Sequence, residues 1–222
     1  MTGVFERALG ADFAHLHPRV RERLALSGGR GMIGHGVMDR IWHGRDFTRP
    51  FLSLGARRHI LFPDRGRNVP FTIENYPYVD GHGRETVSFV RTFEFPQRRR
   101  RFDAQMVYSA GRGLVDYLGT HQHLAVDLAV SVRPDGGFRI RSGEFRLREG
   151  PVRTRLPRGI TGTATVDEWF DDGSGQFRIA VAVVHPRFGP VFGYEGGFSA
   201  RYVDVGGGVS GAVKPLREKV MD

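Results

Sequence analysis

The spacing of apolar residues changes once along the chain, near residue 30. Before that point it is helical, with apolar side chains at Phe5, Leu9, Phe13 and Leu16. Pro18 is typical of the first turn of a second helix, and Ser27-Gly28-Gly29 marks its end. We therefore predict an N-terminal helical segment over residues 1–27.

Beyond residue 30 the apolar residues alternate with polar ones, which is the period of a half-buried β-strand. Turn sequences rich in Asp and Gly separate the alternating runs, for example Pro134–Gly137 and Asp171–Gly175, and such turns join antiparallel neighbours. The pattern predicts about nine strands and one short helix in the connection of residues 44–68. The strands are expected near residues 34–42 (a weak signal), 69–78, 86–95, 102–108, 114–118, 124–132, 138–147 (broken at Ser142-Gly143), 160–170, 177–184 and 191–203.

Regularly spaced strands joined by tight turns predict a mainly antiparallel β fold. No strand–helix–strand spacing occurs, so a parallel sheet is not expected. Glycines inside the last strands suit the bends of a closed barrel, and closure removes exposed sheet edges. We therefore favour a lipocalin-like antiparallel β-barrel over a sandwich. Residues 1–204 are expected to form this single domain, and residues 205–222 a mobile Gly-rich linker with a polar C-terminal tail.

Composition excludes several classes of site. The 222-residue chain has no cysteine, which excludes disulfides, thiolate metal sites and cysteine nucleophiles. Its formal net charge is +9, but only Lys214 and Lys219 among the 33 basic residues are lysines. A nucleic-acid-binding protein usually carries both basic residue types, so we expect no nucleic-acid partner. No apolar run approaches about 18 residues and no signal sequence is evident, so we expect a cytoplasmic protein without a membrane span.

Three segments of the sequence are distinctive, at Val4–Phe13, Phe89–Phe93 and Phe177–Phe198. They resemble domain of unknown function family 4166, which is widespread in actinobacteria, and the resemblance covers residues 3–203. Some members of that family are fused behind a saccharopine-dehydrogenase-like reductase domain, which implies a metabolic setting. This chain lacks the Gly-rich nucleotide fingerprint of such a domain, so it resembles the standalone form. The resemblance implies no catalytic residues.

Arg91 interrupts an apolar strand face. Alternation places it on one side with Val87, Phe89, Phe93 and Phe95. A buried guanidinium needs a paired carboxylate or another anion, because an unpaired buried charge costs several kcal/mol. Arg91 is therefore expected to point into the barrel and to hold either a carboxylate of the protein or an anionic group of a ligand.

Two glutamates are candidates to complete such a site. Glu168 shares its strand face with Val166 and Phe170, and Glu195 lies between Gly193 and Gly197, where missing side chains leave room for a ligand. A carboxyl group in an apolar pocket has a raised pKa and can transfer protons near neutrality. Glu168 could instead be only the ion-pair partner of Arg91. The predicted catalytic set is Arg91, Glu168 and Glu195.

Aromatic side chains on the predicted strands are numerous enough to line a cavity for a flat or lipophilic molecule, although a filled aromatic core is the commoner outcome. The predicted ligand-binding residues are Tyr76, Tyr78, Phe89, Phe93, Trp169, Phe192 and Tyr194.

The sequence offers one alternative metal site. His121 and His123 would lie on the same side of an extended strand, with Asp127 further along it. A polar outer strand face explains the same pattern, because the opposite face of residues 124–132 is apolar. We expect neither a metal nor another cofactor.

Three functions remain open from the sequence. The first is a cofactor-free cyclase or isomerase of secondary metabolism that acts on a small lipophilic or aromatic, possibly anionic, metabolite. The second is a non-catalytic carrier or sensor of such a molecule. The third is an accessory module for a reductase partner, which only the family's fusions suggest. A hollow barrel with inward Arg and carboxyl groups would favour the first function, and a filled core the third.

Overall fold

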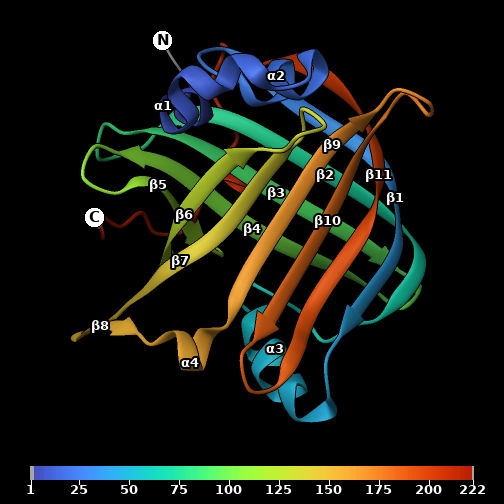
Figure 1. The fold of residues 1–222 in the computed structure, drawn as a ribbon. Helices are drawn as coiled ribbons and strands as arrows, with labels where there is room; N and C mark the ends of the chain where they lie inside the picture. Colours follow the sequence, from blue (N-terminus) through green and yellow to red (C-terminus); the bar gives the residue numbers. More distant parts are fainter. Residues whose placement is uncertain (1–2, 222) are drawn as a thin grey trace.

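The computed structural model describes residues 3–221, and its centre is a closed antiparallel β-barrel (Figure 1). In these residues ten strands follow one another around the barrel in the order β6-β5-β4-β3-β2-β1-β11-β10-β9-β7, and β6 also pairs with β7 to close it. Closure confirms the barrel rather than the sandwich. The strands are β1 (Arg30–His43), β2 (Gly66–Val79), β3 (Glu85–Phe95), β4 (Arg98–Ser109), β5 (Gly113–Leu118), β6 (Leu124–Val132), β7 (Phe138–Glu149), β9 (Thr163–Asp171), β10 (Gln176–His185) and β11 (Gly189–Asp204).

Short helices cover the two ends of the barrel. The N-terminal segment, predicted as helix, contains α1 (Val4–Leu9), the 3-10 helix η1 (Gly10–His15) and α2 (Pro18–Leu24), and it lies over one end (Figure 1). The opposite end carries η2 (Asp46–Thr48), α3 (Arg49–Ala56) and α4 (Arg158–Thr161). No helix in residues 3–221 is long and apolar enough to cross a membrane.

The helical segment covers its end of the barrel because its apolar residues face inward. Phe5 and Phe13 are buried, and the Phe5 ring makes edge-on contacts with Phe89 (5.9 Å between centroids) and Phe138 (5.5 Å). His17 caps α2 by accepting a hydrogen bond from the Arg19 N–H. The apolar residues that recur at helical spacing in the sequence are therefore those on the face that packs against the strands.

The barrel wall opens between β7 and β9. These strands pair only from Phe138–Arg141 to Thr165–Glu168. At the point of divergence the Ser142 hydroxyl, rather than a backbone carbonyl, accepts the Ala164 N–H at 2.8 Å. The short strand β8 (Val152–Leu156), which pairs with β7, and helix α4 occupy the connection beyond. The sequence prediction was wrong here, because it missed β8 and began the next strand at Ile160, which lies in α4.

Hydrogen bonds join the C-terminal segment to the barrel. It lies along the outside of β3–β5, where the Leu216 N–H donates to the Thr120 carbonyl and the Met221 N–H donates to the Tyr117 hydroxyl. The Lys219 N–H donates to the Gln122 side chain at 2.7 Å. These contacts fix the segment against the barrel.

Candidate functional site

The lumen of the barrel is filled by side chains in one part and hollow in another. The hollow part is a cavity of about 270 Å³ next to the opening between β7 and β9. Four polar side chains line it: Arg91, Asp116, Ser142 and Thr161. The apolar lining consists of Ile60, Leu61, Phe102, Met106, Leu118, Leu124, Val126, Leu128, Ile140, Phe145, Leu156, Ala164, Val166, Val181 and Val183. Such a lining suits a small, mainly apolar molecule with one or two polar groups.

Arg91 lies where its strand pattern predicts, inside the barrel. Only 7% of the residue is exposed, and its guanidinium lies 4.0 Å from the centroid of the Phe102 ring. Nη1 reaches across the lumen and donates a long hydrogen bond of 3.5 Å to the hydroxyl of Tyr194. Nε is buried and has no hydrogen-bond partner among the described residues. The guanidinium therefore retains donor capacity for an anion or a carbonyl oxygen.

Asp116, which the sequence analysis missed, is the second charged group of the cavity. It is buried, and its Oδ1 has no hydrogen-bond partner in residues 3–221. Burial raises the pKa of Asp116 to about 7, although the positive charge of Arg91 opposes this shift. A sequence signal existed, because alternation places Asp116 on one face with Leu114 and Leu118. Asp116 can therefore exchange a proton near neutral pH.

Glu168 is buried, as predicted, but its ion pair is with Arg23 of α2. Arg23 Nε and Glu168 Oε1 are 3.0 Å apart, and both side chains are nearly inaccessible. Burial raises the pKa of Glu168, and the charges of Arg23 and Arg91 oppose that effect. Glu168 is thus engaged at the helix-covered end and does not line the cavity.

Four predicted site residues face outward. Glu195 is exposed on β11, so it does not join Arg91. On β2, Tyr76 donates to the Glu74 carboxylate at 2.7 Å on the outer face, which also carries Tyr78. On β9, the Trp169 ring lies 5.0 Å from the Arg133 guanidinium. Each belongs to the strand parity opposite to an inward neighbour, as Glu195 follows Tyr194 and Trp169 follows Glu168. Their assignment to the interior was wrong.

The other four predicted aromatic residues point inward but fill the lumen. Phe93 is fully buried, with its ring centroid 5.0 Å from that of Phe62, 5.0 Å from that of Phe71 and 5.2 Å from that of Tyr194. Phe89, Phe192 and Tyr194 are also buried. None of them lines the cavity. Phe93, Phe192 and Tyr194 pack in one cluster of rings, whereas Phe89 packs against Phe5 of α1.

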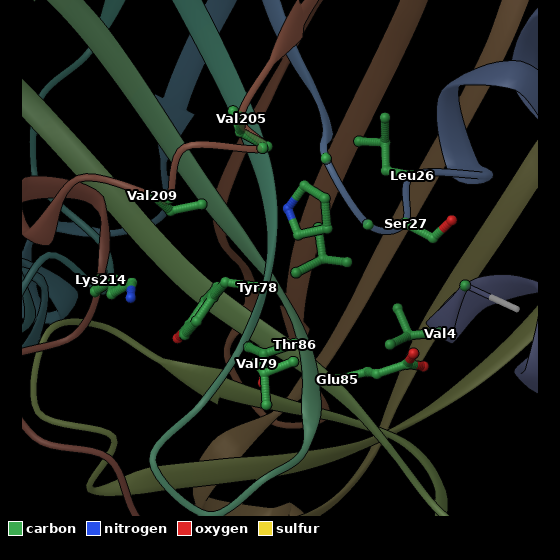
Figure 2. Close-up of a pocket in the computed structure, with 17 residues that line it drawn as sticks. Val4, Leu26, Ser27, Tyr78, Val79, Glu85, Thr86, Val205, Val209 and Lys214 are labelled. Atoms are coloured by element: carbon green, nitrogen blue, oxygen red, sulfur yellow. The ribbon is translucent and has the colours of Figure 1, made fainter. Parts of the chain in front are cut away.

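A second hollow, of about 360 Å³, lies on the outside between the barrel and the C-terminal segment. Figure 2 shows Tyr78, Glu85 and Lys214 among its lining residues. These polar groups already have neighbours: the Glu85 carboxylate lies 3.8 Å from Arg7, and the Lys214 ammonium lies 4.9 Å from the Tyr78 ring centroid. Within residues 3–221, the Tyr78 hydroxyl is the buried lining atom of this hollow without a hydrogen-bond partner, and it is neutral, unlike Arg91 Nε and Asp116 Oδ1 of the interior cavity.

The histidine pair does not form the alternative metal site. His121 and His123 lie in the loop between β5 and β6 rather than on a strand, and Asp127 binds Arg112 and Arg146 instead. Burial lowers the pKa of His123 to about 4. Among the described residues, no three His, Asp or Glu side chains gather into a possible metal site.

Comparisons with known proteins identify a family. The family model described as "Domain of unknown function (DUF4166)" matches residues 16–198. The chain is 32% identical over 199 residues to "Uncharacterized protein YndH" of Bacillus subtilis (strain 168), a match that covers 89% of this chain and 97% of that protein. A crystal structure of a trans-AT PKS dehydratase domain from Brevibacillus brevis covers 83% of this chain and 82% of its own at 10% identity. Its TM-score of 0.21 is too low to carry any argument.

Proposed function

The chain belongs to the DUF4166 family, whose description names no activity, and from its cavity we propose that the barrel binds a small apolar molecule carrying an anionic or carbonyl oxygen. The apolar body of the ligand would occupy the space between β4–β7 and β9–β10. Its oxygen would accept hydrogen bonds from Arg91. The opening between β7 and β9 would admit it.

One observation carries this proposal: Arg91 Nε and Asp116 Oδ1 are buried beside an apolar cavity and have no hydrogen-bond partner in the described part of the chain. An unsatisfied buried polar atom costs about 1–3 kcal/mol, and more when it is charged. Two such atoms in one small cavity therefore lower the stability of the folded protein when no ligand is bound. A ligand oxygen that pairs with Arg91 removes part of this cost, which favours binding over a purely structural role.

Replacing Arg91 with Met is expected to weaken the binding of an aromatic carboxylate at least about tenfold, equivalent to about 1.4 kcal/mol. Met keeps the bulk of the side-chain stem and removes only the charge. The probe is 2-naphthoate, and 2-naphthamide serves as its neutral counterpart. Isothermal titration calorimetry of both probes measures the effect. The amide should lose less affinity than the carboxylate, because its carbonyl oxygen accepts a hydrogen bond from Arg91 but carries no charge.

The matched control is Arg139→Met, which removes an arginine from the outer face of β7, where Arg139 pairs with Asp167. This variant should bind 2-naphthoate as the parent does. The proposal fails if neither probe binds the parent protein. It also fails if Arg91→Met, folded by circular dichroism, binds 2-naphthoate unchanged.

A second candidate function, acid–base catalysis of an isomerisation or cyclisation without a cofactor, is favoured by the pKa of Asp116 near 7. The Asp116 carboxylate would take a proton from the carbon next to a bound carbonyl group. Arg91 would stabilise the resulting enolate oxygen, and protonated Asp116 would return the proton to carbon.

This catalytic proposal predicts that the protein speeds hydrogen–deuterium exchange at the α-carbons of 2-tetralone in D₂O. Exchange at pH 8, followed by proton NMR, should fall to the uncatalysed rate in Asp116→Asn. Equal rates with and without the parent protein would argue against acid–base catalysis on this ketone class. That result would leave the binding proposal intact, because calorimetry tests it separately.

A further inference from the structure

The end of the barrel that carries α3 and α4 exposes an unusual amount of apolar surface. Phe51 and Leu54 of α3 are 76% and 65% exposed, and Ile160 of α4 is 69% exposed. Among the described residues, more than half of the exposed large apolar side chains lie at this end. We call the following set the apolar rim: Phe47, Phe51, Leu54, Ile160, Val184 and Phe188.

The members of the apolar rim lie on neighbouring elements. The rings of Phe47 and Phe188 are 4.9 Å apart between centroids, which joins η2 to the β10–β11 turn. The His185 ring stacks on Phe188 at 4.5 Å, and its Nε2 lies 2.8 Å from the Gly159 carbonyl of α4. These contacts place η2, the β10–β11 turn and α4 side by side at this end of the barrel, where the exposed apolar side chains gather.

The charges around the apolar rim are mostly positive. Among the described residues of η2, α3, α4, the β10–β11 turn and the residues next to them, Arg45, Arg49, Arg57 and Arg187 are exposed, against one exposed carboxylate, Asp46. Within residues 3–221, none of these four guanidinium groups has an ion-pair partner within 4.0 Å. Protruding apolar side chains surrounded by arginines suit the surface of an anionic bilayer. The apolar side chains can enter the boundary with the acyl chains, and the arginines can contact the anionic headgroups.

We propose that the apolar rim docks this protein on the surface of an anionic lipid bilayer. Phe51, Leu54 and Ile160 enter the boundary between headgroups and acyl chains, and the surrounding arginines contact lipid phosphates. Nucleic acid is the weaker candidate, because its surface offers no apolar layer for aliphatic side chains. The rim also adjoins the cavity, since Ile60, just after α3, and Thr161 of α4 line it. The proposal does not depend on what the cavity binds.

Co-sedimentation with vesicles tests this proposal. The parent should sediment with vesicles of phosphatidylcholine containing phosphatidylglycerol, and at least about tenfold less with phosphatidylcholine alone, since the arginine contribution needs anionic lipid. Phe51→Ser with Leu54→Ser should weaken partition at least tenfold. Arg49→Gln with Arg187→Gln should weaken binding to the anionic vesicles and leave the small binding to neutral vesicles unchanged.

Each double variant has a matched control. Leu216→Ser removes an equally exposed apolar side chain, 74% accessible, from the C-terminal segment. Arg21→Gln with Arg201→Gln removes two exposed arginines from the opposite end of the barrel. Both controls should partition as the parent does. The proposal is overturned if the parent does not sediment with anionic vesicles, if the controls weaken binding as much as the rim variants, or if the protein binds duplex DNA through the same arginines and the Phe51–Leu54 change has no effect on vesicles.

Discussion

Arg23→Met is expected to lower the free energy of unfolding by about 3–5 kcal/mol at pH 7, because it leaves the Glu168 carboxylate buried without its cation. Arg23 Nε lies 3.0 Å from Glu168 Oε1, and the two side chains are 2% and 5% exposed. Met retains much of the volume of the aliphatic stem but removes the guanidinium, whose central carbon lies 5.5 Å from the centroid of the Phe198 ring. Urea denaturation followed by circular dichroism measures the change.

The loss of stability should depend on pH in a defined direction. Burial raises the pKa of Glu168 above its ordinary value of 4.5, and removing Arg23 raises it further. A folded state that holds the proton more tightly than the unfolded state loses stability as pH rises above 4.5. The deficit of Arg23→Met should therefore be largest near neutral pH and should shrink as pH falls toward 4.5.

Glu168→Gln in the Arg23→Met background should restore most of the lost stability, because the neutral amide leaves no buried charge without a partner. The exposed pair of Arg139 and Asp167 provides the comparison, and Arg139→Met should change stability far less. A loss in Arg23→Met that is independent of pH and is not rescued by Glu168→Gln would contradict the ion-pair explanation. It would point instead to the packing of α2.

Strand alternation predicted the barrel and the inward direction of Arg91, because burial follows a period of two wherever one sheet face is covered. The same rule applied to residues 114–118 would have found Asp116 between Leu114 and Leu118. It would also have placed Glu195 outside, opposite in parity to Phe192 and Tyr194. Glycine neighbours suggested room at Glu195, but room on the outer face is not a cavity.

The partner of Glu168 could not be predicted in the same way. Arg23 shares the inward face of α2 with Val20 and Leu24, so its burial has a helical signal. Which strand that face meets depends on how the N-terminal segment lies across the barrel end, and no local pattern encodes this placement. β8 was missed because Val152-Arg153-Thr154-Arg155 is exposed throughout. A strand without a buried face has no row of apolar residues that would mark it in the sequence.

Asp116→Asn should raise the free energy of unfolding by about 4 kcal/mol at pH 8 and by little at pH 4. Burial raises the pKa of Asp116 from an ordinary 3.8 to about 7, and each pKa unit corresponds to about 1.36 kcal/mol. Since the folded state holds the proton more tightly, the parent loses stability from about pH 4 upward, and the loss is complete once the pH exceeds about 7. Asn keeps the shape of the protonated acid and does not titrate. Urea denaturation at both pH values measures the difference.

A gain in the free energy of unfolding of this size would show that the Asp116 carboxylate destabilises the folded protein. Natural proteins keep such destabilising groups mainly where function requires them. An Asp116→Asn variant that is more stable than the parent but no longer speeds α-proton exchange would therefore show that the carboxylate is kept for catalysis. Asp127→Asn, at a carboxylate whose oxygens already bind Arg112 and Arg146, is the matched comparison and should not stabilise the protein. If Asp116→Asn is no more stable than the parent at pH 8, the folded protein stabilises the Asp116 carboxylate. The main support for acid–base catalysis in the cavity would then be removed.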